Sequence, residues 1–141
     1  MSEQEVTAMN AHRLFRLAVH VGLAGLVGSA MAAGALSKAE VITLLSGSKA
    51  TQRFTDPSTH GSALVEYGAD GRYTNTHTGS KYKGVVETGT WRVNENGQLC
   101  VTLEGKAEAK CHYLVPRPGG AYELTQDPAK SGKVQITAVS K

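Results

Sequence analysis

The chain has 141 residues, 40% hydrophobic and 19% charged, with a formal net charge of +3. This length has room for one domain, and the basic residues stand singly among acidic ones instead of forming the stripe that a nucleic-acid partner requires. The composition therefore indicates one globular domain with a mixed, solvated surface and excludes a nucleic-acid-binding protein.

The N-terminal segment has the pattern of a secretory signal peptide. Arg13 and Arg16 supply the positive charge, and residues 17–33 follow as a run that is apolar apart from a histidine and a serine. The run ends in small residues, Ser-Ala-Met-Ala-Ala, of the kind that signal peptidase accepts. We expect cleavage after Ala32, which removes residues 1–32 and delivers the protein to the periplasm or outside the cell.

Two points of this interpretation stay open. Met9 is a second candidate for the translation start, since the residues after it make a more usual signal start than the acidic first residues do. Residues 17–36 are also about as long as a membrane-spanning helix, which needs about 20 residues. An uncleaved segment would therefore anchor the protein in a membrane, but the glycines and the alanine-rich end of the run favour cleavage.

A short amphipathic helix is predicted over residues 37–46, at the start of a single domain that spans 33–141. Ser37 and Glu40 have the spacing of a capping box, in which each side chain accepts a hydrogen bond from the other residue's backbone N–H. Three apolar residues after Glu40 share one helical face, and Gly47 can end the helix. Because the apolar face must be covered, we expect the helix to lie over one open end of a sheet or barrel.

From residue 48 onward, the sequence has the period of two that is typical of strands. Tight hairpin turns are favoured by Asp-Gly at 70–71 and by Asn-Glu-Asn-Gly at 94–97. The predicted strands cover residues 50–54, 62–67, 72–78, 82–87, 89–93, 98–103, 107–115, 121–125 and 134–139.

The strand order predicts the fold class. Consecutive strands joined by short turns must pair antiparallel, and a twisted meander of this length tends to close on itself because closure removes the exposed edges. We therefore expect a mainly β fold, a small antiparallel up-and-down barrel or a strongly curved sheet, preceded by one short α-helix. A flat two-sheet sandwich is the alternative.

The cysteines, Cys100 and Cys111, lie on the clearest pair of predicted strands. In an oxidising compartment two such residues form a disulfide, whereas a metal site would need more Cys or His residues at ligand spacing. A turn centred on Gly105 and Lys106 places the cysteines directly opposite each other, and a loop over 104–107 puts them at the closer, non-hydrogen-bonded position. The pattern leaves open which face of this hairpin is buried.

Three segments form a combined pattern: Leu36-Ser-Lys-Ala-Glu-Val with Leu44-Leu45-Ser-Gly47, then Tyr67-Gly-Ala-Asp-Gly71, then Gly89-Thr-Trp-Arg-Val93 with Gly97-Gln-Leu-Cys100 and Cys111-His-Tyr113. Together they resemble a group of small exported proteins of Gram-negative bacteria that carry a lipocalin-like domain of unknown function. The resemblance covers residues 36–125. It implies a short helix followed by a meander barrel with a Gly-Thr-Trp motif and two cysteines, and it implies no activity, cofactor or site residue.

Three histidines follow the signal segment: His60, His77 and His112. If two of them pointed into one barrel, they could bind a metal or a haem iron. They lie on separate predicted elements without the spacing of a metal motif. We therefore expect surface or rim histidines and no metal or other cofactor.

No catalytic residue is predicted. The cysteines are expected to be bridged, no Gly-x-Ser-x-Gly motif occurs, and most strand carboxylates are expected to face solvent. These carboxylates are Glu66, Glu87, Glu104, Glu108 and Glu123. The sequence therefore predicts a protein that is not an enzyme.

Aromatic residues are the candidates for contact with a ligand, since they often line the mouths of barrels. The candidates are Tyr67, Tyr73, Tyr82, Trp91 and Tyr113. The same rings are needed for the core of a domain with a single Trp. Core packing is the favoured role for Trp91.

The sequence supports three functional hypotheses. The first is a non-catalytic periplasmic binding or accessory protein that holds a small apolar or amphipathic ligand or contacts an envelope protein. The alternatives are a protein inhibitor or stress-protective factor, by analogy of fold, and a haem or metal carrier. A ligand carrier requires an enclosed apolar cavity. An inhibitor requires a barrel filled by its own side chains, with a protruding loop at 55–61 or 80–84. A metal carrier requires two histidines that converge on one point.

Overall fold

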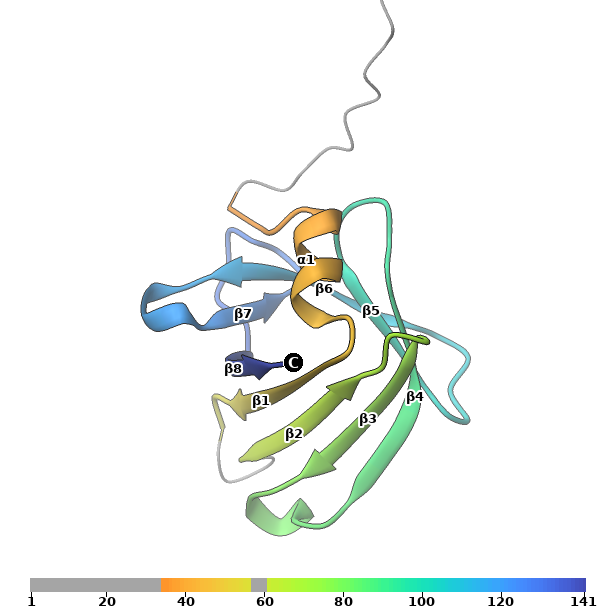
Figure 1. Ribbon diagram of the computed structural model, residues 1–141. Coiled ribbons are helices and arrows are strands. Elements are labelled where there is room, and N and C mark those ends of the chain that lie inside the picture. The colour runs from red at the N-terminus through yellow and green to blue at the C-terminus, as the bar shows by residue number, and fades with distance from the viewer. Residues whose placement is uncertain (1–33, 57–60) are drawn as a thin grey trace, which may run out of the picture.

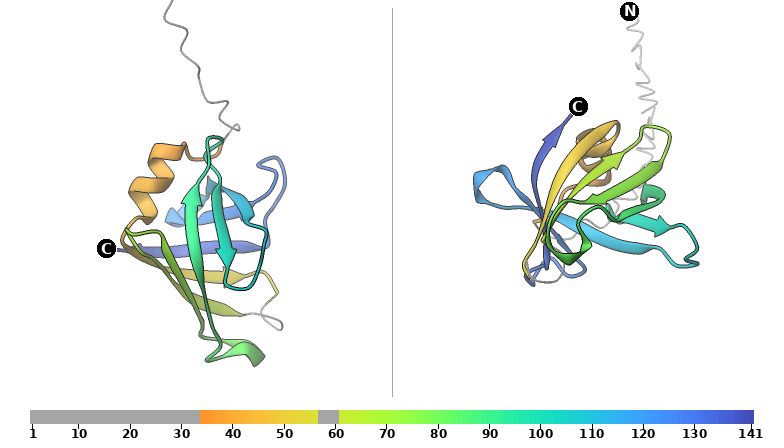
Figure 2. Two further views of the ribbon diagram at one scale, coloured as in Figure 1. Left: turned by 90° about the vertical axis from the view of Figure 1, so that its right-hand side faces the viewer. Right: turned by 90° about the horizontal axis from the view of Figure 1, so that it is seen from below.

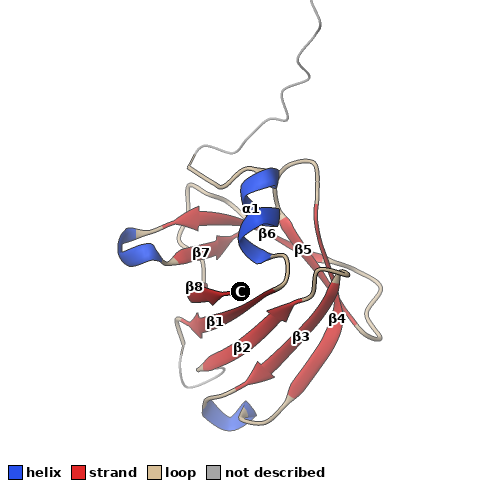
Figure 3. Ribbon diagram, viewed as in Figure 1, coloured by secondary structure: helices blue, strands red, loops and turns tan. Residues whose placement is uncertain are grey.

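The computed structural model describes residues 34–56 and 61–141 (Figure 1). The expected signal peptide over 1–32, the candidate start at Met9 and the candidate ligand His60 lie outside the described residues. The described chain forms a closed antiparallel barrel of eight strands, in which each strand pairs with the next in sequence and the last pairs with the first (Figure 3). This topology confirms the predicted mainly β, up-and-down barrel preceded by one short α-helix.

The helix and strands, in chain order, are α1 (Lys38–Leu45), β1 (Ser48–Phe54), β2 (Ser62–Tyr67), β3 (Arg72–His77), β4 (Val86–Val93), β5 (Leu99–Leu103), β6 (Lys110–Pro116), β7 (Tyr122–Thr125) and β8 (Val134–Ser140). Two short 3-10 turns, η1 (Ser80–Tyr82) and η2 (Pro118–Gly120), interrupt the connections before β4 and β7. No helix within the described ranges has the length and apolar character needed to cross a bilayer.

The helix α1 begins at the predicted capping box. The Ser37 hydroxyl accepts a hydrogen bond from Glu40 N at 3.3 Å, and Ser37 N donates to Glu40 Oε2 at 2.7 Å. These bonds lower the pKa of the Glu40 carboxyl because they stabilise its charged form. Val41 and Leu45 are fully buried in the core, so the apolar face of α1 covers one end of the barrel, as expected (Figure 2).

The C-terminal residue lies at the same end of the barrel. Lys141 Nζ donates to the carbonyl of Thr43 at 2.9 Å and to that of Ser46 at 2.6 Å. The last carbonyls of a helix lack partners within the helix and carry partial negative charge, so a lysine there is favourable. This contact ties the end of β8 to the helix that precedes β1.

The end of the barrel beneath α1 is filled by side chains. Trp91 packs edge-on against Tyr67 with ring centroids 5.6 Å apart, and its Nε1–H donates to the Gly68 carbonyl at 2.8 Å. Burying a large apolar side chain stabilises a fold by roughly 1.5–3 kcal/mol. Trp91 thus has the core role favoured for it from the sequence. The buried cluster consists of Val41, Leu45, Ala50, Val65, Tyr67, Tyr73, Trp91, Leu99, Leu114 and Ile136.

The strand β4 corrects one sequence expectation. Two strands, 82–87 and 89–93, were expected because glycines suggested bends, but the structure has one continuous strand preceded by the turn η1. Gly84, at φ 88°, lies between that turn and β4. Gly89 does not bend the strand: it lies where the backbone of β5 comes so close that an added Cβ would collide with the Thr102 carbonyl. The glycine marks a close approach of two strands.

The hairpin of β5 and β6 has the predicted register. Cys100 pairs with Cys111, the two are joined by a disulfide, and their Cα atoms are 4.0 Å apart. That separation matches the closer, non-hydrogen-bonded position, at which Cα atoms are about 4.5 Å apart. Pairing stops at Val101, so the connection is longer than the expected loop over 104–107 and extends to residue 109. β5 instead continues its pairing with β4 as far as Leu103.

Glu123 of β7 is tied to the loops on either side of its strand. Glu123 is 6% exposed and accepts hydrogen bonds from Arg117 Nε at 3.3 Å and Nη2 at 3.1 Å. It also accepts a hydrogen bond from Gly132 N, in the loop that leads to β8. These donors, Arg117 above all, lower the pKa of the Glu123 carboxyl. A carboxylate that was expected to face solvent thus joins two loops of the barrel.

We expect removal of the disulfide to destabilise the barrel. The bridge closes a segment with a sequence separation of 11, and a C100A/C111A variant should lose about 2–3 kcal/mol of unfolding free energy. Urea unfolding followed by circular dichroism measures this loss. Reductant should lower the urea midpoint of the unmodified protein to about that of the variant, and it should leave the midpoint of the variant unchanged. If reductant does not change the midpoint of the unmodified protein, the prediction is wrong.

We also expect Gly89→Ala to destabilise the protein. The new methyl group would meet the Thr102 carbonyl and crowd Leu103 Cα, and such overpacking costs about 1–3 kcal/mol. The matched control is Thr90→Ala, on the exposed face of the same strand, for which a change of at most about 0.5 kcal/mol is expected. If the two variants have equal midpoints of thermal unfolding, then β4 and β5 lie further apart at Gly89 than the structure shows, and the prediction is wrong.

Candidate functional site

The half of the barrel away from α1 is hollow. Side chains from all eight strands surround a cavity of about 1020 Å³ that is partly open to solvent. This volume lies at the upper limit of small-molecule sites in proteins, about 300–1,000 Å³. The turn η1 and the connection between β5 and β6 stand at its outer end, opposite α1 (Figure 1). The barrel therefore has space for a ligand.

One wall of the cavity is apolar. β5 supplies Leu99, Val101 and Leu103, since strand alternation places these residues inside the barrel. The wall continues with Leu124 of β7, which pairs with Val134 of β8. Apolar surface that a ligand covers here contributes roughly 25 cal/mol per Å². The inward face of the β5–β6 hairpin, which the sequence left open, is thus the one that carries these three residues.

A polar cluster stands on β3 and β4, where the register sets Asn75 opposite Glu87. Glu87 Oε2 accepts a hydrogen bond from Asn75 Nδ2 at 3.2 Å and lies 3.2 Å from His77 Nε2. Asn75 and His77 are each 6% exposed, whereas Glu87 is half-buried. Strand alternation and register together bring an amide, an imidazole and a carboxylate to one point of the cavity wall, the Asn75–His77–Glu87 cluster.

The amide of Asn75 is only half satisfied. Its Oδ1 atom is buried, yet it accepts no hydrogen bond from any residue that the structure describes. Such an acceptor costs about 1–3 kcal/mol of stability. The amide cannot turn over to relieve this, because its oxygen would then face the Glu87 carboxylate, which is also an acceptor. The cluster therefore keeps a buried acceptor in the cavity wall.

Two tyrosines form the floor of the cavity, next to the core. Tyr67 Oη accepts a hydrogen bond from Gln52 Nε2 at 3.0 Å, and its ring meets that of Tyr73 edge to face with centroids 5.7 Å apart. Burial raises the pKa of both hydroxyls, and the Glu87 carboxylate raises that of Tyr73 further. Both hydroxyls therefore keep their protons at neutral pH and remain hydrogen-bond donors.

The strand β6 adds a histidine and a lysine to the lining, His112 and Lys110. Burial lowers the pKa of His112, and the positive charge of Lys110 lowers it further. Both effects favour the neutral imidazole, in which one nitrogen donates and the other accepts. It stands opposite Leu99 in the strand register, between the apolar wall and the outer end.

The structure brings together some of the aromatic candidates. Tyr67, Tyr73 and Tyr82 line the cavity. Trp91 lies in the core beneath α1, and Tyr113 is half-buried on β6, where it alternates with the inward-facing neighbours on either side. The candidates thus divide among the cavity, the core and the opposite face of one strand.

The candidate metal ligands do not form a metal centre within the described ranges. His77 and His112 both line the cavity, but His77 is engaged by Glu87. Residues 34–56 and 61–141 contain no group of three or more His, Cys, Asp or Glu side chains arranged to hold a metal ion. Both cysteines are consumed by the disulfide, so neither is available as a ligand or a nucleophile.

Sequence reasoning missed the polar half of the lining. Asn75 follows the candidate Tyr73 by two residues, so the alternation of β3 would have placed it on the same face. Glu87 was grouped with carboxylates expected to face solvent. It faces the cavity because β4 runs without a break and keeps it in phase with the buried Trp91.

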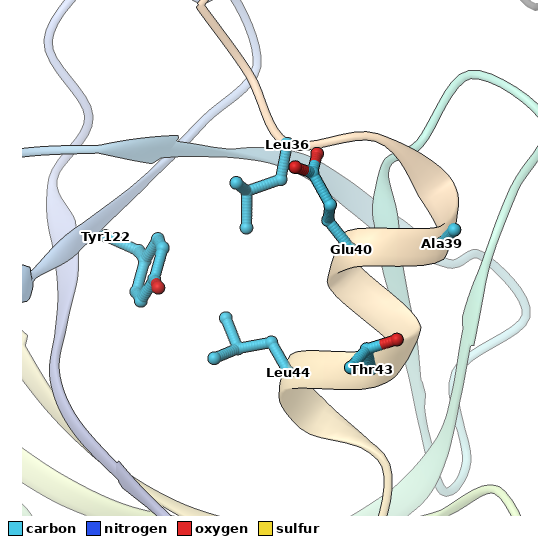
Figure 4. Close-up of a pocket in the computed structure, with 6 residues that line it drawn as sticks. All are labelled: Leu36, Ala39, Glu40, Thr43, Leu44 and Tyr122. Atoms are coloured by element: carbon cyan, nitrogen blue, oxygen red, sulfur yellow. The ribbon is translucent and has the colours of Figure 1, made fainter.

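A second hollow, of about 410 Å³, is a shallow groove between α1 and β7. Figure 4 shows Leu36, Leu44 and Tyr122 facing one another across it, with Glu40 at its edge. It is more open than the barrel cavity and has few polar groups that converge on one point. The barrel cavity is therefore the candidate functional site.

The chain was also compared with known proteins. No family model, no curated protein and no solved structure matches it.

Proposed function

We propose that the protein is a non-catalytic, exported binding protein that holds a small amphipathic molecule in the hollow half of its barrel. The observation that carries this proposal is the cavity of about 1020 Å³ with an apolar wall on one side and the Asn75–His77–Glu87 cluster on another. Such a combination, mostly apolar with a few convergent polar groups, is typical of small-molecule sites.

The walls of the cavity are held in place before any ligand arrives. The disulfide fixes β5 against β6, and the Tyr67 ring is fixed between the hydrogen bond from Gln52 and the edge contact with Trp91. A site that is already ordered loses less conformational entropy on binding. This rigidity supports a binding role for the cavity.

Export is the second part of the proposal. Disulfides form and persist in oxidising compartments such as the periplasm, and the described chain carries one between Cys100 and Cys111. The signal pattern of residues 1–32 agrees with that environment. We propose the periplasm as the site of function.

The open volume favours this function over the alternatives. An inhibitor of the kind considered from the sequence would have a barrel filled by its own side chains, and half of this barrel is hollow. A haem or metal carrier would have histidines that converge, whereas His77 is paired with Glu87. Ligand binding is therefore the function that the geometry supports best.

We expect the cavity to bind an apolar probe that a side chain placed inside it can exclude. N-phenylnaphthylamine, a neutral dye that fluoresces in apolar surroundings, should bind one molecule per chain. Val101→Trp fills the cavity from β5 and should weaken binding by about tenfold or more, equivalent to about 1.4 kcal/mol. Fluorescence titration gives the two dissociation constants.

The matched control for this experiment is Thr88→Trp. Thr88 is exposed on the outer face of β4, so the same ring is added to the protein without entering the cavity. Its affinity for the dye should stay within about twofold of the original. If the unmodified protein binds no dye, there is no binding cavity inside the barrel. The same conclusion follows if the Val101→Trp and Thr88→Trp variants bind the dye with equal affinity.

We expect the protein to reach the periplasm without its first 32 residues and with both thiols oxidised. Cell fractionation of a Gram-negative host that expresses the full chain, followed by intact-mass measurement, tests the first point. Thiol alkylation with and without prior reduction tests the second, since only the reduced sample should gain two labels. An intact chain in the cytosol with reactive cysteines would rule out export.

A further inference from the structure

We propose that the Asn75–His77–Glu87 cluster selects the ligand: the cavity holds an amphipathic amine, with its positively charged nitrogen at the cluster and its apolar body along the β5 wall. This inference rests on the proposed function, because it requires that the cavity binds a small molecule. It adds the chemical class of that molecule.

The hydrogen bonds within the cluster leave one acceptor without a donor. Glu87 Oε2 is engaged by Asn75 Nδ2 and His77 Nε2, which fixes the direction of the Asn75 amide. Its Oδ1 is then an acceptor, in a side chain that is 6% exposed, and receives no donor from the described residues. This atom has almost no accessible surface, so a ligand's N–H or O–H group reaches it only when the side chains around it shift, whereas Glu87, 40% exposed, is directly accessible.

Charge favours a cation at the cluster. Glu87 stands beside this acceptor, and a protonated amine adds the attraction of opposite charges to the hydrogen bond that the carboxylate accepts. The same carboxylate repels a ligand carboxylate or phosphate. The Tyr73 ring also lines the cavity beside the cluster, and aromatic faces attract cations. A protonated amine matches both the charge of Glu87 and the preference of an aromatic ring for cations.

The remaining charges of the cavity lining lie on one segment. Lys106, Glu108 and Lys110 are the other charged residues of the lining. They lie in the connection between β5 and β6 or at the first residue of β6, at the outer end. Leu99 and Val101 lie deeper on β5, where the barrel approaches its core. The cluster flanks η1 at the outer end as well, so the cavity offers a carboxylate near its opening and apolar contacts for the ligand's body further inside.

The experiment uses three probes of equal chain length: decylamine, decanoate and decanol. Protein purified with its disulfide intact is unfolded in urea and refolded, so that retained molecules are removed, and each probe is titrated by calorimetry. We expect decylamine to bind about tenfold more tightly than decanoate, with decanol between them, because only the amine carries a charge opposite to that of Glu87 and decanoate carries the same charge.

Variants assign the preference to the cluster. Glu87→Gln keeps the shape and removes the charge; it should weaken decylamine binding by about tenfold and change decanol binding by less than about twofold. Asn75→Leu removes the buried acceptor and should weaken decylamine in the same direction. The matched control is Glu66→Gln, which makes the same charge change on the outer face of β2, where Glu66 pairs with Lys49. It should alter no affinity.

The outcomes separate this inference from the proposed function. If none of the three probes binds, the proposed function itself fails. If decanol or decanoate binds as tightly as decylamine, or if Glu66→Gln and Glu87→Gln have equal effects, the cavity binds ligands but the cluster does not select an amine. Should Asn75→Leu fail to fold, Glu87→Gln still decides, because that side chain is 40% exposed and carries no core packing.

Discussion

Closure of the sheet, through the pairing of β1 with β8, is the constraint on which the rest of this structure depends. Closure satisfies the backbone groups of both edge strands, and it also divides every strand into residues that face inward and residues that face solvent. An eight-stranded barrel is just wide enough to be filled by side chains or to hold one small ligand. Whether it is filled depends on which side chains the strands place inside at each level, and here the two ends differ.

The two ends of the barrel use the inward positions in opposite ways. Beneath α1, large rings such as Trp91 and Tyr67 interlock with the buried face of the helix, and each polar tip has a partner: the Gly68 carbonyl for the indole and Gln52 for the phenol. At the other end, the inward positions carry Asn75 and polar neighbours, which do not fill the space between the strands. Buried polar groups are costly when they lack partners. The polar side chains at the hollow end therefore lower the stability of that end of the barrel, and they supply the groups that can bind a ligand.

The sequence predicted the parts of this fold that depend on local patterns. The capping box at Ser37 marked the start of the helix, and the period of two marked the strands, including the register that joins the cysteines. It could not predict the hollow, because the volume inside a barrel depends on how eight inward faces combine, not on any one of them. The phase of β4 was lost for a similar reason: the close approach at Gly89 involves Thr102 of the next strand, so the glycine resembled a bend. Without that phase, Glu87 could not be assigned to the interior.

A hollow end requires that the seams around it hold without the support of a packed core. Two of the seams are short: β5 pairs with β6, and β7 with β8, over three residue pairs each. Each short seam has a cross-link of another kind. The first has the disulfide at its centre, and the second has the hydrogen bond from Gly132 N, in the loop before β8, to Glu123 on β7. A covalent bond and a side-chain hydrogen bond thus add to the few backbone pairs of these two seams. Because pairing of β5 with β6 ends at Val101, the connection between these strands extends beyond the sheet, where it forms the outer wall of the cavity.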